Sequence, residues 1–281
     1  MLTDLKKIMH YARLRPPDLR VAAEREEDGV LKRIVTYQTA FGIRRAALLL
    51  QPAGEAQPGE EVRPAILYVH WYEPEAVDSN RKQFEPEALK MAAGGAVCLL
   101  VETMWSDLDW FIKRRQEDDW DLSIRQTVEL RQAMDLLLAQ PGVDSRRCAY
   151  VGHDFGAMYG ILMGSVDPRP CSYVLMAPTA RFSDWYLYYP RLEGEARRAF
   201  IEQMDPIDPV RRVADLAPAP LLFQFGTQDP HVPVERANEL FEAAGEPKQV
   251  CWYESGHGLN PQAEADRTAW LAEKLGLEVE G

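Results

Sequence analysis

The sequence predicts a single α/β domain in which helices flank a mostly parallel central sheet. Short apolar runs end in turn residues and alternate with longer helix-like stretches, a pattern typical of parallel strands joined by crossover helices. The chain has 281 residues, which suits one domain covering 1–281. Its hydrophobic content of 46% is sufficient for a complete core.

The expected elements follow one another along the whole chain. A short helix is expected within residues 1–20, ended by Pro16 and Pro17. Strands are expected at 33–39, 43–50, 65–69, 96–101, 149–151, 173–176, 220–225 and 250–253. Helices are expected at 83–93, 122–139, 157–164 and 261–275. The first two strands form an antiparallel hairpin, and the loop at 51–63 is expected to be exposed.

Two stretches differ in character from these elements. Residues 108–121 combine aromatic and charged side chains and are predicted to form an amphipathic connector. Residues 179–215 begin with a cluster of aromatic side chains and continue as a charged, helix-like piece. We interpret this second stretch as a short cap-like insertion within the domain.

Composition excludes several classes of partner and cofactor. Acidic residues outnumber basic ones, 44 to 32, and the net charge of −12 argues against nucleic acid or an anionic membrane as a partner. No run approaches the ~20 apolar residues that a membrane span requires. The four cysteines stand far apart and form no metal-binding pattern, and the first residues contain no long apolar run of a signal peptide. We expect a cytoplasmic protein with no metal and no organic cofactor.

The stretch Gly152-His153-Asp154-Phe155-Gly156 joins a short apolar strand to a helix-like run of small residues. Residues without a bulky side chain at 152 and 156 permit a very tight strand-to-helix turn. The central residue, Asp154, is then presented at the tip beside the positive end of the helix. The alternative is an ordinary strand-to-helix turn with an aspartate capping the helix.

At this motif the chain resembles the α/β-hydrolase superfamily, and the turn is most similar to that of its aspartate-nucleophile branches, the epoxide hydrolases and dehalogenases. The later pattern around Asp229 and His257 is similar to dienelactone hydrolases and prolyl oligopeptidases. Nucleophile, acid and histidine follow in the order of the superfamily, each after an expected strand. The resemblance implies the α/β-hydrolase fold, with Asp154, Asp229 and His257 as catalytic residues and 179–215 as its cap.

The resemblance also implies an oxyanion hole, formed by the backbone N–H groups of Trp71 and Phe155. Trp71 stands where the family usually has glycine, so this loop departs from the family pattern. Candidate substrate-binding residues lie on the neighbouring loops and on the insertion: His70, Trp105, Trp185, Tyr186 and Tyr188. The alternative for these aromatic residues is packing of loops and insertion onto the body.

An aspartate at the tip of the turn changes the chemistry that is available. Its carboxylate is ionised near neutral pH without the help of a base. Attack on a carboxylic ester would produce an anhydride and expel a far more basic alkoxide, whereas attack on a saturated carbon leaves a stable alkyl ester. His257, oriented by Asp229, would then activate water against that ester. The sequence therefore predicts hydrolysis of an epoxide or an alkyl halide.

Two other functions remain open from the sequence. The first is an esterase or acyl hydrolase of the dienelactone-hydrolase type, with Asp154 activating water directly. The second is a non-catalytic descendant that binds a ligand in the former active site. In each case the expected partner is a small molecule, and the N-terminal helix is a candidate contact for a homo-oligomer.

Overall fold

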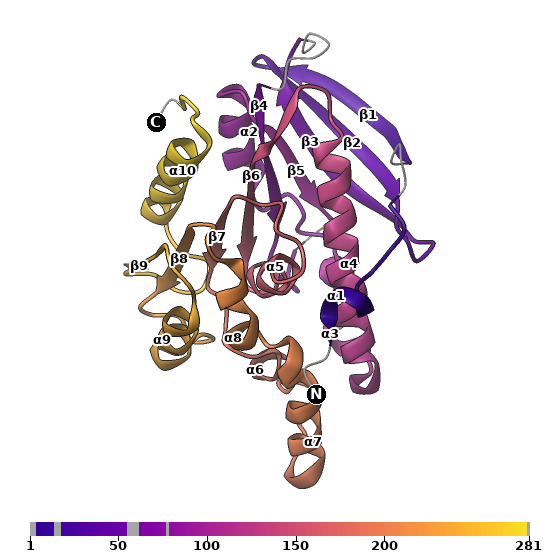
Figure 1. The fold of residues 1–281 in the computed structure, drawn as a ribbon, viewed down its shortest axis with the longest axis vertical. Helices are drawn as coiled ribbons and strands as arrows, with labels where there is room; N and C mark the ends of the chain where they lie inside the picture. The colour runs from indigo at the N-terminus through magenta and orange to yellow at the C-terminus, as the bar shows by residue number, and fades with distance from the viewer. Residues whose placement is uncertain (1–3, 14–17, 55–61, 77–78, 280–281) are drawn as a thin grey trace.

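One sheet runs through the whole of the computed structural model, which describes residues 4–13, 18–54, 62–76 and 79–279 (Figure 1). Nine strands of this described part pair in the order β1-β2-β3-β5-β4-β6-β7-β8-β9. The six strands β4 to β9 pair with one another in parallel, while β1, β2 and β3 are antiparallel to their neighbours. The mostly parallel sheet expected from the sequence is confirmed.

The strands have the following bounds: β1 Leu19–Glu27, β2 Val30–Gln38, β3 Arg44–Pro52, β4 Arg63–Val69, β5 Val97–Val101, β6 Val143–His153, β7 Ser172–Met176, β8 Leu221–Gly226 and β9 Lys248–Tyr253. The α-helices are α1 Leu5–Ile8, α2 Glu85–Ala93, α3 Trp110–Lys113, α4 Asp119–Leu138, α5 Phe155–Gly164, α6 Phe182–Tyr186, α7 Gly194–Met204, α8 Pro209–Arg212, α9 Val234–Ala243 and α10 Pro261–Leu275. Short 3₁₀ turns occur at η1 Met104–Ser106, η2 Gln116–Asp118, η3 Asp205–Ile207 and η4 Val213–Leu216.

Helices cover both faces of the sheet and enclose two apolar cores. Successive side chains of a strand point to opposite faces, so Leu67 of β4 joins one core and Ile66 joins the other. The first core contains α4 and α5, and the second contains α2 and α10. This arrangement explains why the central strands read as continuous apolar runs.

The N-terminal region differs from the expectation for 1–20. The helix there is only Leu5–Ile8, and β1 begins already at Leu19, while 14–17 lie outside the described residues. Every residue of β1 except Leu19 is exposed, so the strand lacks the apolar face by which a strand is recognised in a sequence. The expected hairpin is therefore the inner part of an antiparallel unit of three strands. Part of the expected loop, 55–61, also lies outside the described residues.

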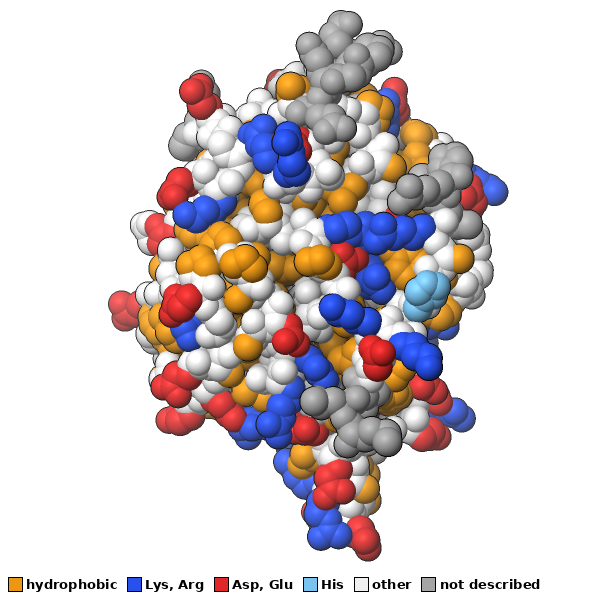
Figure 2. Space-filling model, viewed as in Figure 1, with side chains coloured by type: hydrophobic (Ala, Val, Ile, Leu, Met, Phe, Trp, Pro, Cys, Tyr) orange, Lys and Arg blue, Asp and Glu red, His pale blue; other side chains and the backbone are white. Residues whose placement is uncertain are grey.

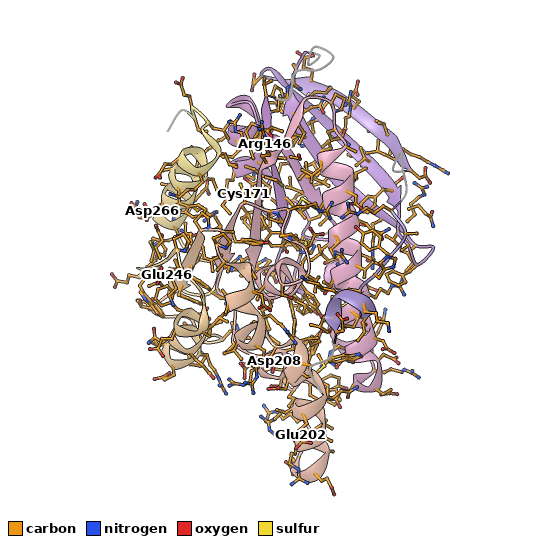
Figure 3. All side chains as sticks on the ribbon, viewed as in Figure 1. Arg146, Cys171, Glu202, Asp208, Glu246 and Asp266 are labelled. Carbon is orange, nitrogen blue, oxygen red and sulfur yellow. The ribbon has the colours of Figure 1, made fainter. Side chains whose placement is uncertain are left out.

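The segment between β7 and β8 forms α6, α7 and α8, and α7 projects away from the body (Figure 1). Glu202 lies on this projecting helix, while Asp208 lies where the segment returns to the body (Figure 3). The Asp208 carboxylate is buried and accepts the backbone N–H of Phe182 at 2.9 Å. Burial raises the pKa of Asp208 to about 7. This bond links the two ends of the segment, which therefore starts and finishes at a fixed position beside the sheet.

Candidate active site

The carboxyl ends of β4, β6, β8 and β9 lie at the same edge of the sheet, because these strands run in parallel. Asp154 follows β6 directly, and the turns that carry Asp229 and His257 follow β8 and β9. Ligands bind at this edge in open α/β sheets. The expected catalytic residues therefore reach one region from three separate strands.

Asp154 occupies a strained backbone conformation at the turn into α5, with φ 53° and ψ −117°. The turn is tight because two glycines lack a Cβ. A Cβ on Gly152 would lie 2.5 Å from the Gly156 carbonyl, and one on Gly156 would lie 2.1 Å from the Val69 carbonyl oxygen. Both glycines are therefore required by close backbone approach, as the sequence suggested.

His257 and Asp229 form a hydrogen-bonded pair. The imidazole Nδ1–H donates to Asp229 Oδ2 at 2.8 Å. The other carboxylate oxygen accepts the backbone N–H groups of His231 and Val232 at 2.8 and 3.2 Å. Burial opposes ionisation of Asp229, but the bond to His257 and these two N–H groups hold its pKa below the ordinary value. A fixed, charged Asp229 thus orients the ring and leaves its Nε2 atom directed elsewhere.

Asp154 and His257 interact through their charges. Asp154 Oδ1 and His257 Nε2 are both buried, and neither has a hydrogen-bond partner among the described residues. Burial raises the pKa of Asp154 to about 7, against the opposing charge of His257. Burial lowers the pKa of His257, yet the bond to Asp229 and the charge of Asp154 bring it above the ordinary value. The two atoms are free to act on a third group.

Two backbone N–H groups address the Asp154 carboxylate itself. Those of Phe155 and Tyr72 favour its ionised form and so lower its pKa, against the larger effect of burial. The N–H of Trp71 is instead donated to Gln83 Oε1 at 3.0 Å. In this structure the Trp71 N–H thus has a protein partner, and its role in an oxyanion hole stays a prediction.

The aromatic residues expected to contact substrate have different surroundings. Trp185 lies against the His257 ring, with centroids 5.7 Å apart, and its buried Nε1 has no partner among the described residues. Trp105 donates its Nε1–H to the His70 carbonyl at 3.1 Å, and Tyr186 shares its hydroxyl with Tyr159 at 2.5 Å. Tyr188 is 48% exposed.

His70 is held within the protein rather than directed to a ligand. Its Nδ1 lies 2.6 Å from the Trp71 carbonyl and its Nε2 lies 3.0 Å from Ser106 Oγ. Since the carbonyl can only accept, Nδ1 carries the proton and Nε2 accepts from Ser106. These contacts fit the packed loop anchor that was the alternative interpretation of this residue.

Sequence reasoning missed Tyr72 and Gln83. Tyr72 is adjacent to the residue that was expected, and only the path of the loop distinguishes the two. Gln83 lies in the turn before α2, and no local sequence signal marks it. Among the described residues, no group of His, Cys, Asp and Glu side chains could hold a metal ion. In the same part of the chain, no helix combines the length and apolar character needed to cross a bilayer.

The fold of the chain matches the folds of solved structures. An acetyl xylan esterase from a Paenibacillus species matches with a TM-score of 0.80 and 17% identity, covering 96% of this chain and 92% of the esterase. Acetyl xylan esterase 1 from a Thermoanaerobacterium species matches with a TM-score of 0.77 and 16% identity, covering 97% and 94%. The chain has the α/β-hydrolase fold.

Similarity in sequence to curated proteins is more limited. No family model matches the chain. The uncharacterized protein Rv2307c of Mycobacterium tuberculosis is 31% identical over 122 residues, which are 43% of this chain. The match spans 41% of the length of that relative.

Proposed function

We propose that the protein is a hydrolase in which Asp154 attacks a saturated carbon and forms an alkyl-enzyme ester. The observation that carries this proposal is the buried Asp154 carboxylate, whose Oδ1 has no partner among the described residues and whose ionised form the backbone N–H groups of Phe155 and Tyr72 favour. In a serine esterase such donors receive the carbonyl oxygen of the substrate. Here they favour the carboxylate of the nucleophile itself, so the carbonyl oxygen of an Asp154 ester would lie within their influence.

In the first step, Asp154 Oδ1 displaces the leaving group. A C–O bond forms as the bond from carbon to halogen breaks, and the halide departs with the electron pair. With an epoxide, the ring C–O bond breaks instead, and the oxygen stays on the substrate as an alkoxide that takes a proton from water. Burial supports this step because a carboxylate with few hydrogen bonds to water is a stronger nucleophile. Oδ2 becomes the carbonyl oxygen of the ester.

In the second step, water attacks the ester carbonyl while His257 Nε2 takes its proton. The negative charge develops on Oδ2, where the N–H groups of Phe155 and Tyr72 favour it. The bond from the carbonyl carbon to the alkyl oxygen then breaks, and the alcohol leaves with the proton returned by His257, which restores the Asp154 carboxyl group. Forming the ester removes the charge of Asp154, which is one of the contributions that raise the pKa of His257. The imidazole is therefore more readily neutral, and so able to act as a base, in the intermediate than in the free enzyme.

The leaving group needs a donor, and Trp185 Nε1 is the one we assign. It is buried without a partner, and its ring contacts both His257 and Phe155, with centroids 5.7 and 5.8 Å apart. An indole N–H suits a halide or another weakly basic anion. The Tyr186 hydroxyl is bonded to Tyr159 and Tyr188 is half exposed, so the tyrosine acid of an epoxide reaction has less support.

Ester hydrolysis is the second candidate, because both solved structures described above are acetyl xylan esterases. It would require Asp154 to activate water directly on a substrate ester. Asp154→Asn and Asp154→Ser distinguish the two candidates when tested with aryl acetates. Acetate hydrolysis by the wild type that Asp154→Asn abolishes supports the esterase, whereas hydrolysis that appears only in Asp154→Ser supports the alkylation mechanism.

The direct test is to trap the intermediate. His257→Gln incubated with short alkyl halides and epoxides should accumulate the alkyl adduct on the peptide that contains Asp154, detected by mass spectrometry. The double variant with Asp154→Asn is the control and should remain unmodified. In single turnovers of wild type in ¹⁸O-water, the label should enter the Asp154 carboxylate before it appears in product. Label found only in product would refute the proposal.

A further inference from the structure

Gln83 connects two loops of the active site although it is distant in sequence from both catalytic carboxylates. Its Oε1 accepts the backbone N–H of Trp71 at 3.0 Å, and its Nε2 lies 2.7 Å from His153 Nδ1. The other nitrogen of His153 lies 2.9 Å from the carbonyl oxygen of His257. An unbroken chain of three hydrogen bonds thus joins the loop after β4 to the loop that carries His257.

The chemistry of the groups fixes the direction of every bond in this chain. A backbone N–H can only donate, so the Gln83 oxygen must face Trp71 and the amide NH₂ must face His153. His153 Nδ1 is therefore an acceptor, and the ring proton sits on Nε2, which donates to the His257 carbonyl. His153 must be neutral, and burial holds its pKa well below the ordinary value. A charged ring would place two donors face to face.

The rings of the same residues reinforce the connection. The Trp71 indole stacks on His153 at a centroid distance of 4.7 Å and on His257 at 5.4 Å, with interplanar angles of 20° and 12°. Trp71 thus contacts His257 through its ring while its backbone is held by Gln83. Its backbone precedes Tyr72, whose N–H addresses the Asp154 carboxylate.

We propose that Gln83 is a positioning residue that holds the Tyr72 N–H and the His257 imidazole in fixed relation to each other, through His153 and Trp71. This inference rests on the proposed function and extends it. Formation of the alkyl ester depends on the Asp154 oxygen and the leaving-group donor. Hydrolysis of the ester depends on the Tyr72 N–H and on His257 together. Gln83 therefore serves the second step far more than the first.

The matched pair of variants is Gln83→Leu and Gln132→Leu. Gln132 is buried and Gln83 is partly buried; like Gln83, Gln132 accepts a loop N–H, that of Ala40 at 2.9 Å, but it belongs to none of the site contacts. With a short alkyl halide in rapid-quench experiments read by mass spectrometry, Gln83→Leu should hydrolyse its ester about tenfold to a hundredfold more slowly, since displacements of an ångström have effects of this size. Its alkylation rate should stay within about twofold of wild type. Gln132→Leu should change neither rate.

Gln83→Glu tests the assigned direction of the bonds. A carboxylate at 83 still accepts from Trp71 but requires a proton on His153 Nδ1, so the bridge re-forms only with a charged His153. We expect ¹⁵N NMR to show that extra proton on His153, and the ring to lose it only above the pH at which wild-type His153 titrates. A purely structural role would produce neither signal.

The titration of His257 followed by NMR gives a readout that needs no substrate. Gln83→Leu should shift its midpoint, and Gln132→Leu should not. The inference is overturned if Gln83→Leu keeps both the wild-type midpoint and the wild-type rate of ester hydrolysis, or if Gln132→Leu matches its defects. If no variant, including His257→Gln, ever forms an ester, the proposed function fails, and the His257 titration still decides the role of Gln83.

Discussion

Replacing Asp154 by asparagine should change how folding stability depends on pH. The asparagine amide matches the carboxyl group in shape but cannot ionise. In the wild type, burial raises the pKa of Asp154 from 3.8 to about 7 in the folded protein. The folded state therefore binds this proton more tightly than the unfolded chain does, and ionisation of Asp154 opposes folding.

The sign and size of the effect of Asp154 on the unfolding free energy follow from the difference between its folded and unfolded pKa values. The contribution of Asp154 to stability is fully present below its unfolded pKa of 3.8 and is lost as pH rises through its folded pKa of about 7. Integrating the proton linkage between about pH 4 and about pH 6 gives a loss of about 2 kcal/mol for wild type relative to Asp154→Asn. His257 does not disturb this window, since its pKa is raised above 6.5 in the folded protein and it is protonated in both states.

The assay is urea unfolding of both proteins at a series of pH values. As pH rises across that interval, the unfolding free energy of wild type should fall by about 2 kcal/mol relative to that of Asp154→Asn. Asp215→Asn, which removes an exposed carboxylate, is the control and should show no such trend. A constant difference between wild type and Asp154→Asn at all pH values would refute a raised pKa at this site, and with it the desolvated nucleophile.

The remaining predictions concern the turn, the leaving group and the pH dependence of the first step. Gly156→Ala should lower the unfolding free energy by about 3 kcal/mol in urea titrations because its Cβ would overlap a backbone carbonyl; Gly256→Ala, which meets open space, should be close to neutral. Trp185→Phe should slow alkylation by alkyl halides in rapid-quench assays while preserving the ring contact, and unchanged rates would remove its N–H from the mechanism. Tyr186→Phe should leave epoxide and halide turnover nearly unchanged, since the Tyr186 hydroxyl is hydrogen-bonded to that of Tyr159. A large fall in epoxide turnover would instead show that Tyr186 is the acid that protonates the epoxide oxygen. The alkylation rate of wild type should rise with pH through about 7 as Asp154 ionises, and a flat profile would contradict this.

The turn at Asp154 could be predicted from sequence because both of its glycines stand in one short motif. Gly152 is needed because the Gly156 carbonyl lies against it in the same turn, and Gly156 is needed because the Val69 carbonyl of β4 lies against it. The parallel strands were predicted for a similar reason, since strands buried on both faces are apolar throughout. β1 was missed because its exposed residues carry no such signal.

The exact donors of the site could not be predicted because they depend on contacts between distant segments. The Trp71 N–H is unavailable to Asp154 because it donates to Gln83 Oε1, and Gln83 lies on another segment. The hydrogen-bond partners of the tryptophan Nε1–H groups also depend on contacts between distant segments. Trp105 and Trp185 look equivalent in sequence, and only the fold gives one of them the His70 carbonyl as a partner.

The backbone at position 154 owes its conformation to its neighbours and not to its own side chain. Its N–H donates to the Met176 carbonyl at 2.8 Å, its carbonyl accepts the N–H of Met158 at 2.9 Å, and the flanking glycines permit the bend. Any short side chain grafted at that point would project into the same surroundings. The position of the side chain at 154 is thus set by the fold, whichever residue stands there.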